Sequence, residues 1–185
     1  IFDIRRCSSM EKLTVNKSVV KSLFWYGAFI WLIGLLIIIP HFKEIVPVAS
    51  GIGISDTKIS NALYFAWRLP LTYLVFSLIH TKWSVVIPAV WYYSAFAIRT
   101  LMVVLLFSKG QFVNGTGYLL HTLVFGAVVY VFSLITLRII HNNMFIQSEH
   151  YLVRWFGALK MSLRELWQPL LGSYVLYLLV SLFAG

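Results

Sequence analysis

Two arginines lie inside stretches that are otherwise apolar and long enough to cross a lipid bilayer. Arg68 interrupts the segment at about 60–80, and Arg99 interrupts the segment at about 84–107. A guanidinium stays protonated in proteins, so in hydrocarbon each needs an anion, a water-filled cavity or a route to the headgroups. The apolar segments contain no Asp or Glu. This pattern predicts a cationic site that an anion from outside the chain would occupy.

Two histidines extend the predicted site. His121 lies just inside another apolar segment, and His41 directly follows a further one. If the segments alternate in direction, both histidines and both arginines fall in the same half of the membrane, each arginine about 12 Å deep at the helical rise. We therefore predict Arg68, Arg99, His121 and His41 as an anion- or lipid-binding set. Alternatively, each arginine extends toward the headgroups or bonds backbone carbonyls and serves helix packing alone.

The histidines also allow a redox interpretation. Membrane cytochromes hold haem between two histidines on different helices. His41 with His121, and His80 with His141, would each lie near one membrane surface. Three of these four fall at segment ends, however, whereas haem ligands are usually found within the spans. We therefore predict no cofactor and keep haem b as an alternative.

Sequence patterns for hydrolytic or metal catalysis are absent. The chain contains neither HExxH nor GxSxG. Its single cysteine, Cys7, excludes an intrachain disulfide and a cysteine-rich metal site. Acid–base chemistry within the membrane would rest on histidine alone. The sequence favours a protein that is not an enzyme and leaves the question open.

The composition indicates the class of protein. Of the 185 residues, 60% are hydrophobic and only 11% are charged, whereas soluble domains carry about 25% charged residues. The net charge of +9 could suggest a nucleic-acid partner, but the cations are spread over segment ends and loops rather than clustered on one face. We predict an all-α polytopic integral membrane protein with the lipid bilayer as a partner and no nucleic acid.

Four apolar segments have the length of membrane-spanning helices, which need about 20 residues, and a fifth, shorter segment forms the last predicted span. Residues 1–9 precede Met10 and differ in character from the rest, so we set them apart as a candidate non-native leader. Residues 1–21 form a polar N-terminal segment, 22–185 a single transmembrane domain, and 108–117 a predicted turn-rich loop. The predicted spans are about 22–40, 60–80, 84–107, 118–140 and 169–184.

Residues 144–166 carry a different pattern. Apolar residues recur at three-, four- and seven-residue steps, while Arg154, Lys160 and Arg164 occupy other faces. This pattern predicts an amphipathic helix that lies in the headgroup layer before the last span. A cytoplasmic helix packed against the bundle fits the same residues.

The distribution of positive charge predicts the orientation. With a cytoplasmic N-terminus and five spans, the inner side holds eight cations outside the leader and the outer side three. We therefore predict a cytoplasmic N-terminus and an outside C-terminus, in a bacterial inner membrane or its equivalent. The inner cations are Lys12, Lys17, Lys21, Lys82, Arg138, Arg154, Lys160 and Arg164, and the outer ones are Lys43, Lys58 and Lys109.

Three functions follow from these features. The first is a non-catalytic subunit or binding component of a larger membrane assembly, whose intramembrane cations meet an anionic lipid or the acidic groups of partner subunits. The second is a small transporter or channel in which the same residues line the path of an anionic solute. The third is a haem-binding cytochrome b-type subunit or a lipid-modifying membrane enzyme.

Overall fold

The computed structural model describes residues 17–40, 53–79, 81–146 and 150–184. Within these ranges the regular structure is helical, with a short 3-10 helix, η2, ahead of the third long helix. The elements are α1 (Lys17–Ile38), α2 (Asp56–Ser77), η2 (Lys82–Val85), α3 (Val86–Ser108), α4 (Phe112–Asn143) and α5 (Tyr151–Ala184).

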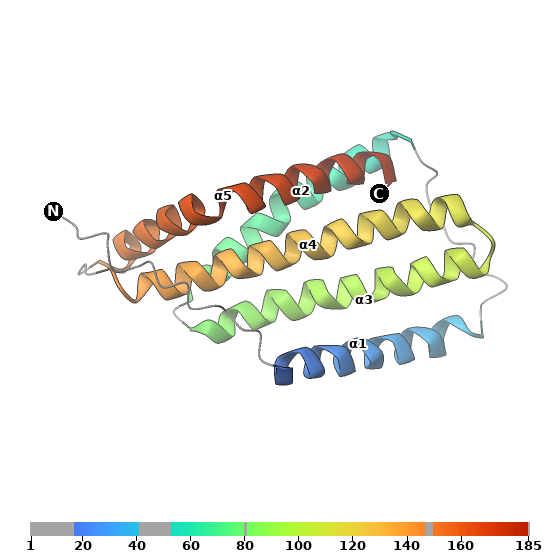
Figure 1. The fold of residues 1–185 in the computed structure, drawn as a ribbon, viewed down its shortest axis with the longest axis horizontal. Helices are drawn as coiled ribbons and strands as arrows, with labels where there is room; N and C mark the ends of the chain where they lie inside the picture. The colour runs from blue at the N-terminus through green and yellow to red at the C-terminus, as the bar shows by residue number, and fades with distance from the viewer. Residues whose placement is uncertain (1–16, 41–52, 80, 147–149, 185) are drawn as a thin grey trace.

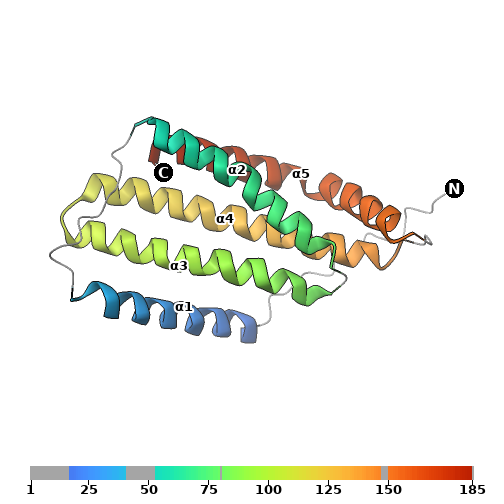
Figure 2. The same ribbon diagram turned by 180° about the vertical axis from the view of Figure 1, so that it is seen from behind.

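The helices run roughly alongside one another and form an elongated bundle (Figure 1). Helix α4 lies in the middle, with α3 on one side and α2 and α5 on the other, and α1 packs on the far side of α3. The view from behind shows α2 crossing the bundle obliquely (Figure 2). The start of α2, the end of α3, the start of α4 and the end of α5 gather at one end, which we call the pocket end.

Three of these helices are long and apolar enough to cross a membrane. They are Trp83–Ser108, Phe112–Asn143 and Tyr151–Phe183, and the apolar part of α1, Phe24–Ile38, is shorter. Large apolar side chains stay exposed on the outside of the bundle, as on α1, where Trp25 and Leu36 are 63% and 65% exposed. Large exposed apolar surfaces of this kind are typical of proteins that contact lipid. In the described residues the expected all-helical class is confirmed, with three helices that could span a membrane.

The predicted loop at 108–117 is wrong in its second half. Helix α3 continues to Ser108 and α4 already begins at Phe112, so the connection is a tight turn in which Gly110 has a φ of 73°. Gly115 lies within α4 and is buried, and a Cβ there would sit 3.1 Å from the ring of Phe107. This glycine lets the two helices approach each other and does not end a helix.

The predicted amphipathic helix and the last predicted span are two helical stretches that meet at a kink within α5. Helix α5 begins at Tyr151, later than the expected start near 144, and continues to Ala184, with non-helical backbone at Leu166 (φ −115°, ψ 18°). Pro169 follows three residues later, and a proline inside a helix removes one backbone hydrogen bond and bends the chain. The kink lies at the boundary that the sequence predicts between the two elements.

The first half of α5 packs on α4. Trp155 and Ala158 are buried against Ile135 and Ile139, and the Asn142 side-chain amide donates to Ser162 Oγ at 3.0 Å. Of the two interpretations of this segment, its position in the structure agrees with a helix packed against the bundle.

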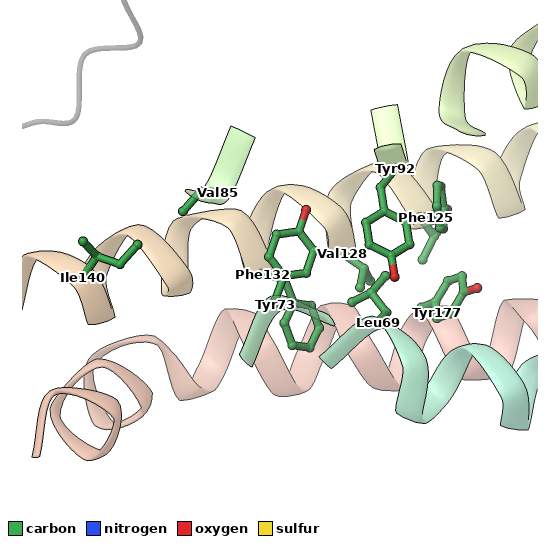
Figure 3. Close-up of a cluster of buried hydrophobic side chains, with 10 residues drawn as sticks. Leu69, Tyr73, Val85, Tyr92, Phe125, Val128, Phe132, Ile140 and Tyr177 are labelled. Carbon is green, nitrogen blue, oxygen red and sulfur yellow. The ribbon is translucent and has the colours of Figure 1, made fainter. Parts of the chain in front are cut away.

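Stacked aromatic rings fill the interior between α2, α3 and α4. The ring of Tyr73 lies 5.7 Å from that of Tyr92 and 5.9 Å from that of Phe132, measured between centroids. The hydroxyls of both tyrosines form hydrogen bonds. Tyr73 Oη lies 2.9 Å from Ser133 Oγ, and Tyr92 Oη donates to Thr72 Oγ1 at 3.3 Å. Figure 3 shows these rings in one cluster. This cluster fixes the rotation of the helices and thereby the side chains that face the pocket end.

Candidate anion-binding pocket

A cavity of about 290 Å³ opens at the pocket end, between α2, α3, α4 and α5. Each of the four helices contributes polar side chains to its lining. They include Lys58 and Asn61 from α2, Arg99 from α3, Tyr118 and His121 from α4, and Ser181 from α5.

Arg99 reaches across from α3 to α4. Its Nη1 lies 3.1 Å from Nδ1 of His121, and its guanidinium carbon lies 4.4 Å from the centre of the Phe125 ring and 5.9 Å from that of Phe65. A guanidinium over a ring face gains from the ring quadrupole, most strongly where water is excluded. The aromatic rings and the histidine therefore hold this charge in the bundle interior.

His121 is buried, with 5% of its surface exposed, and both of its ring nitrogens are in hydrogen-bond contact. Nδ1 faces Arg99, and Nε2 lies 3.0 Å from Ser181 Oγ. Arginine has only donors, so Nδ1 must be the acceptor and Nε2 carries the proton. The imidazole is therefore neutral here, and it stacks on Tyr177 with ring centres 5.7 Å apart and planes 13° apart.

Lys58 is the pocket residue that the sequence analysis missed. It was counted as a loop cation, yet it is only 3% exposed and its Nζ donates to the backbone carbonyl of Phe183 at 2.9 Å. Ser55 caps α2 by accepting from the backbone N–H of Lys58 at 3.4 Å, so the helix begins early enough to turn this side chain inward. Lys58 precedes Ala62 by four residues and Phe65 by seven, so the three residues share one face of a helix. This spacing is the sequence signal for an inward-facing Lys58.

Only part of the predicted set comes together. Arg99 and His121 meet in the pocket, whereas Arg68 stays outside it and donates from Nη1 to the Tyr64 hydroxyl at 2.5 Å. The Arg68 guanidinium carbon lies 5.2 Å from the centre of that same ring. Arg68 thus contacts a side chain of its own helix, one turn away, and does not line the pocket with Arg99 and His121. His41 lies outside the described residues.

The pocket is positively charged. Its described lining contains two cationic side chains, Lys58 and Arg99, and no carboxylate. Glu165 pairs with Arg138, Nε to Oε2 at 3.5 Å, on the parts of α4 and α5 far from the pocket, and Asp56 is exposed at the first turn of α2. Two like charges in a partly dry cavity repel each other and favour any anion that can enter.

The histidines in the described part of the chain are not arranged in pairs. His141 packs on Phe145 at a ring-centre distance of 4.9 Å, at the end of α4 opposite to His121. His80 and His41, the partners proposed for haem, fall outside the described residues. Both nitrogens of His121 already have partners, so no lone pair is free for iron in this arrangement. Among the described residues there is also no group of three or more His, Cys, Asp or Glu that could hold a metal ion.

A second cavity of about 420 Å³ lies between α2, α4 and α5. It sits beside the proline of α2, Pro70, and the kink of α5, and its lining is almost wholly apolar, with Phe132, Leu163 and Trp167 among its residues. It offers a volume for hydrocarbon and no charged group, so the chemistry of the molecule concentrates in the first pocket.

The chain was compared with protein-family models, with curated protein sequences and with solved structures, and nothing matches it.

Proposed function

We propose that this protein is a non-catalytic membrane component that binds an anionic group in the pocket formed by Lys58, Arg99 and His121. The proposal rests on one observation. Two cationic side chains from different helices, Lys58 and Arg99, line the same cavity, and its described lining contains no carboxylate. Two positive charges that line one cavity raise the electrostatic potential inside it. An anion that enters the pocket would interact favourably with Lys58 and Arg99 at once.

The proposal includes a topology of five spans with a cytoplasmic N-terminus. Helices α1 and α2 each have 22 residues, about 33 Å at the helical rise, which is enough for a hydrocarbon core about 30 Å thick. The charge asymmetry supports this orientation, and Lys58, one of the three predicted outer cations, is buried in the pocket. In this topology the pocket opens toward the outer surface.

The pocket lies at different distances from the ends of its four helices. Lys58 is the third residue of α2, and Ser181 lies three residues before the end of α5. Arg99 and His121 lie nine residues inside the ends of α3 and α4, about 14 Å at the helical rise. A lipid phosphate, or a carboxylate of a partner subunit, would enter past the ends of α2 and α5 and would reach Arg99 below the headgroup level.

Packing below the pocket favours binding over transport. Phe125 and Val128 are at most 1% exposed, and the stacked rings of Tyr73, Tyr92 and Phe132 fill the interior beneath them. A permeating anion would have to displace this cluster. The transporter alternative uses the same cations, and an anion flux into proteoliposomes that depends on Arg99 would favour it over our proposal.

The test is retention of anionic lipid by the purified protein. We expect wild-type protein in a neutral detergent to keep phosphatidylglycerol in preference to phosphatidylcholine, measured by native mass spectrometry and lipid extraction. Arg99→Gln should lose most of this preference because it removes the charge at the centre of the pocket. Lys160→Gln, which removes one exposed charge from the first half of α5, is the matched control and should behave as wild type.

The outcome also separates the two sources of the anion. If lipid preference is absent in wild type but Arg99→Gln disrupts co-purification of a partner subunit, the pocket serves an acidic side chain. If Arg99→Gln changes neither lipid nor partner retention, the proposed function fails.

A further inference from the structure

In the contact between Arg99 and His121, the guanidinium is the donor and Nδ1 of His121 is the acceptor. Because the guanidinium can only donate, the 3.1 Å contact exists only while Nδ1 of His121 keeps its lone pair. A proton on Nδ1 would turn an attractive contact into two facing N–H groups, each on a cation. The two side chains could then stay close only if a third group with negative charge lay between them.

We propose that the pocket takes up one proton together with its anion, and that His121 Nδ1 is the atom that receives the proton. This inference rests on the proposed function, because it assigns a proton requirement to the same anion site. In the empty pocket the imidazole is neutral and accepts from Arg99. In the occupied pocket the Nδ1–H and the released guanidinium both donate to the anion, while Nε2–H keeps its contact with Ser181.

The proton balance of this step is simple. One proton passes from water to the Nδ1 lone pair, and the contact that Arg99 loses to His121 is replaced by one to the anion. The bound state therefore carries one more proton and one more anion than the empty state. When the anion leaves, the proton returns to water and the original contact re-forms.

The groups that face His121 explain why the proton and the anion would arrive together. Arg99 from α3 and Lys58 from α2 are the charged side chains of the described lining, and like charges repel, so each opposes a further positive charge on the ring. Tyr177 and Ser181 from α5 and Tyr118 from α4 complete the polar surroundings, and within the described lining no carboxylate stabilises an imidazolium. An anion supplies the missing negative charge, so by linkage each ligand raises the affinity for the other.

A histidine with a purely structural role would not show this behaviour. Such a side chain would bridge Arg99 and Ser181 in every state, and an amide that accepts at the same place would replace it. Proton uptake on anion binding therefore separates a titrating histidine from a packing one.

The experiment uses the purified full chain in a neutral detergent with sulfate as the probe, because sulfate does not itself titrate between about pH 5.5 and about pH 8, where histidine does. Calorimetric titrations in two buffers of different ionisation enthalpy give the number of protons taken up per sulfate. We expect a positive number approaching one. The sulfate affinity should rise as the pH falls, by at most about tenfold for each pH unit, the limit that linkage sets for one proton.

Two variants complete the design. His121→Asn offers Arg99 an oxygen acceptor and cannot titrate, so sulfate should bind with an affinity independent of pH and with no proton uptake. His141→Asn removes a histidine at the far end of α4 and should leave the wild-type pH dependence intact.

Each outcome is decisive for one of the two proposals. If wild-type protein binds sulfate with no proton uptake and no pH dependence, the proton coupling is refuted while the anion site stands. If a proton is taken up equally by His121→Asn, another group carries it and the assignment is refuted. If sulfate and anionic lipid both fail to bind at any pH, the proposed function itself is refuted.

Discussion

At the residue scale, the two arginines in the apolar segments behave differently although the sequence treats them alike. Arg99 lies in the pocket against His121, whereas Arg68 turns back along its own helix to Tyr64. The difference comes from the face of the helix that each occupies, which depends on tertiary packing. A stretch of uniformly apolar sequence does not reveal that face, because every side of the helix looks buried.

The roles of Lys58 and Arg68 can be separated by matched substitutions on the same helix. We expect Lys58→Met to reduce retention of anionic lipid several-fold, because it removes a pocket charge and keeps the length of the side chain. Arg68→Gln should leave retention unchanged, since that guanidinium is paired with Tyr64 outside the pocket. Quantitative lipid analysis of the two purified variants provides the measurement, and equal losses would contradict the assignment.

At the element scale, α3 and α4 pack through a small residue on α4. A Cβ at Gly126 would sit 2.9 Å from the ring of Phe96, whereas a Cβ at Gly172 on α5 would meet nothing within 4 Å. Close helix contacts in membranes commonly use such positions, because without a side chain the backbones can approach.

These two glycines provide a stability test. We expect Gly126→Val to destabilise the folded bundle by about 1–3 kcal/mol, the range for overpacking a filled site, and to lower the melting temperature in detergent. Gly172→Val should have a much smaller effect, since the space beside it is open. A melting temperature for Gly126→Val at or above that of Gly172→Val would show that the α3–α4 contact is not as tight as described.

The sequence predicts the helical class and the approximate positions of the helices, because long apolar runs have few alternatives in lipid. It also brings Arg99 and His121 together, since antiparallel helices of similar length place them at equal depth. It misses the start of α4, where Gly115 suggests a turn but serves a close contact with Phe107. It also misses the inward turn of Lys58. Both misses depend on contacts with a neighbouring helix, which periodicity within one segment does not encode. The boundary predicted between residues 166 and 169 lies at the Leu166 kink of α5, beside Pro169.

At the scale of the whole molecule, the pocket end and the end that carries the Arg138–Glu165 pair are expected to lie on opposite sides of the membrane. Ser108, at the end of α3, and Met144, just after α4, are both exposed and mark these two ends. With Cys7 replaced by serine, Ser108→Cys should react with a membrane-impermeant maleimide added to intact cells. Met144→Cys should react only after the membrane is opened. The reverse pattern would invert the proposed orientation and place the pocket on the inner side.

Helices α4 and α5 have 32 and 34 residues, about 48 and 51 Å at the helical rise, against a hydrocarbon core of about 30 Å. In the proposed topology a large share of this surplus projects on the cytoplasmic side, where the first half of α5 is braced against α4 by Trp155 and by the Asn142–Ser162 hydrogen bond. The protein would thus present a packed pair of helices to the cytosol instead of a flexible loop. A soluble protein that docks there would meet Arg154, Lys160 and Arg164 on α5, and would need an acidic surface to match these cations.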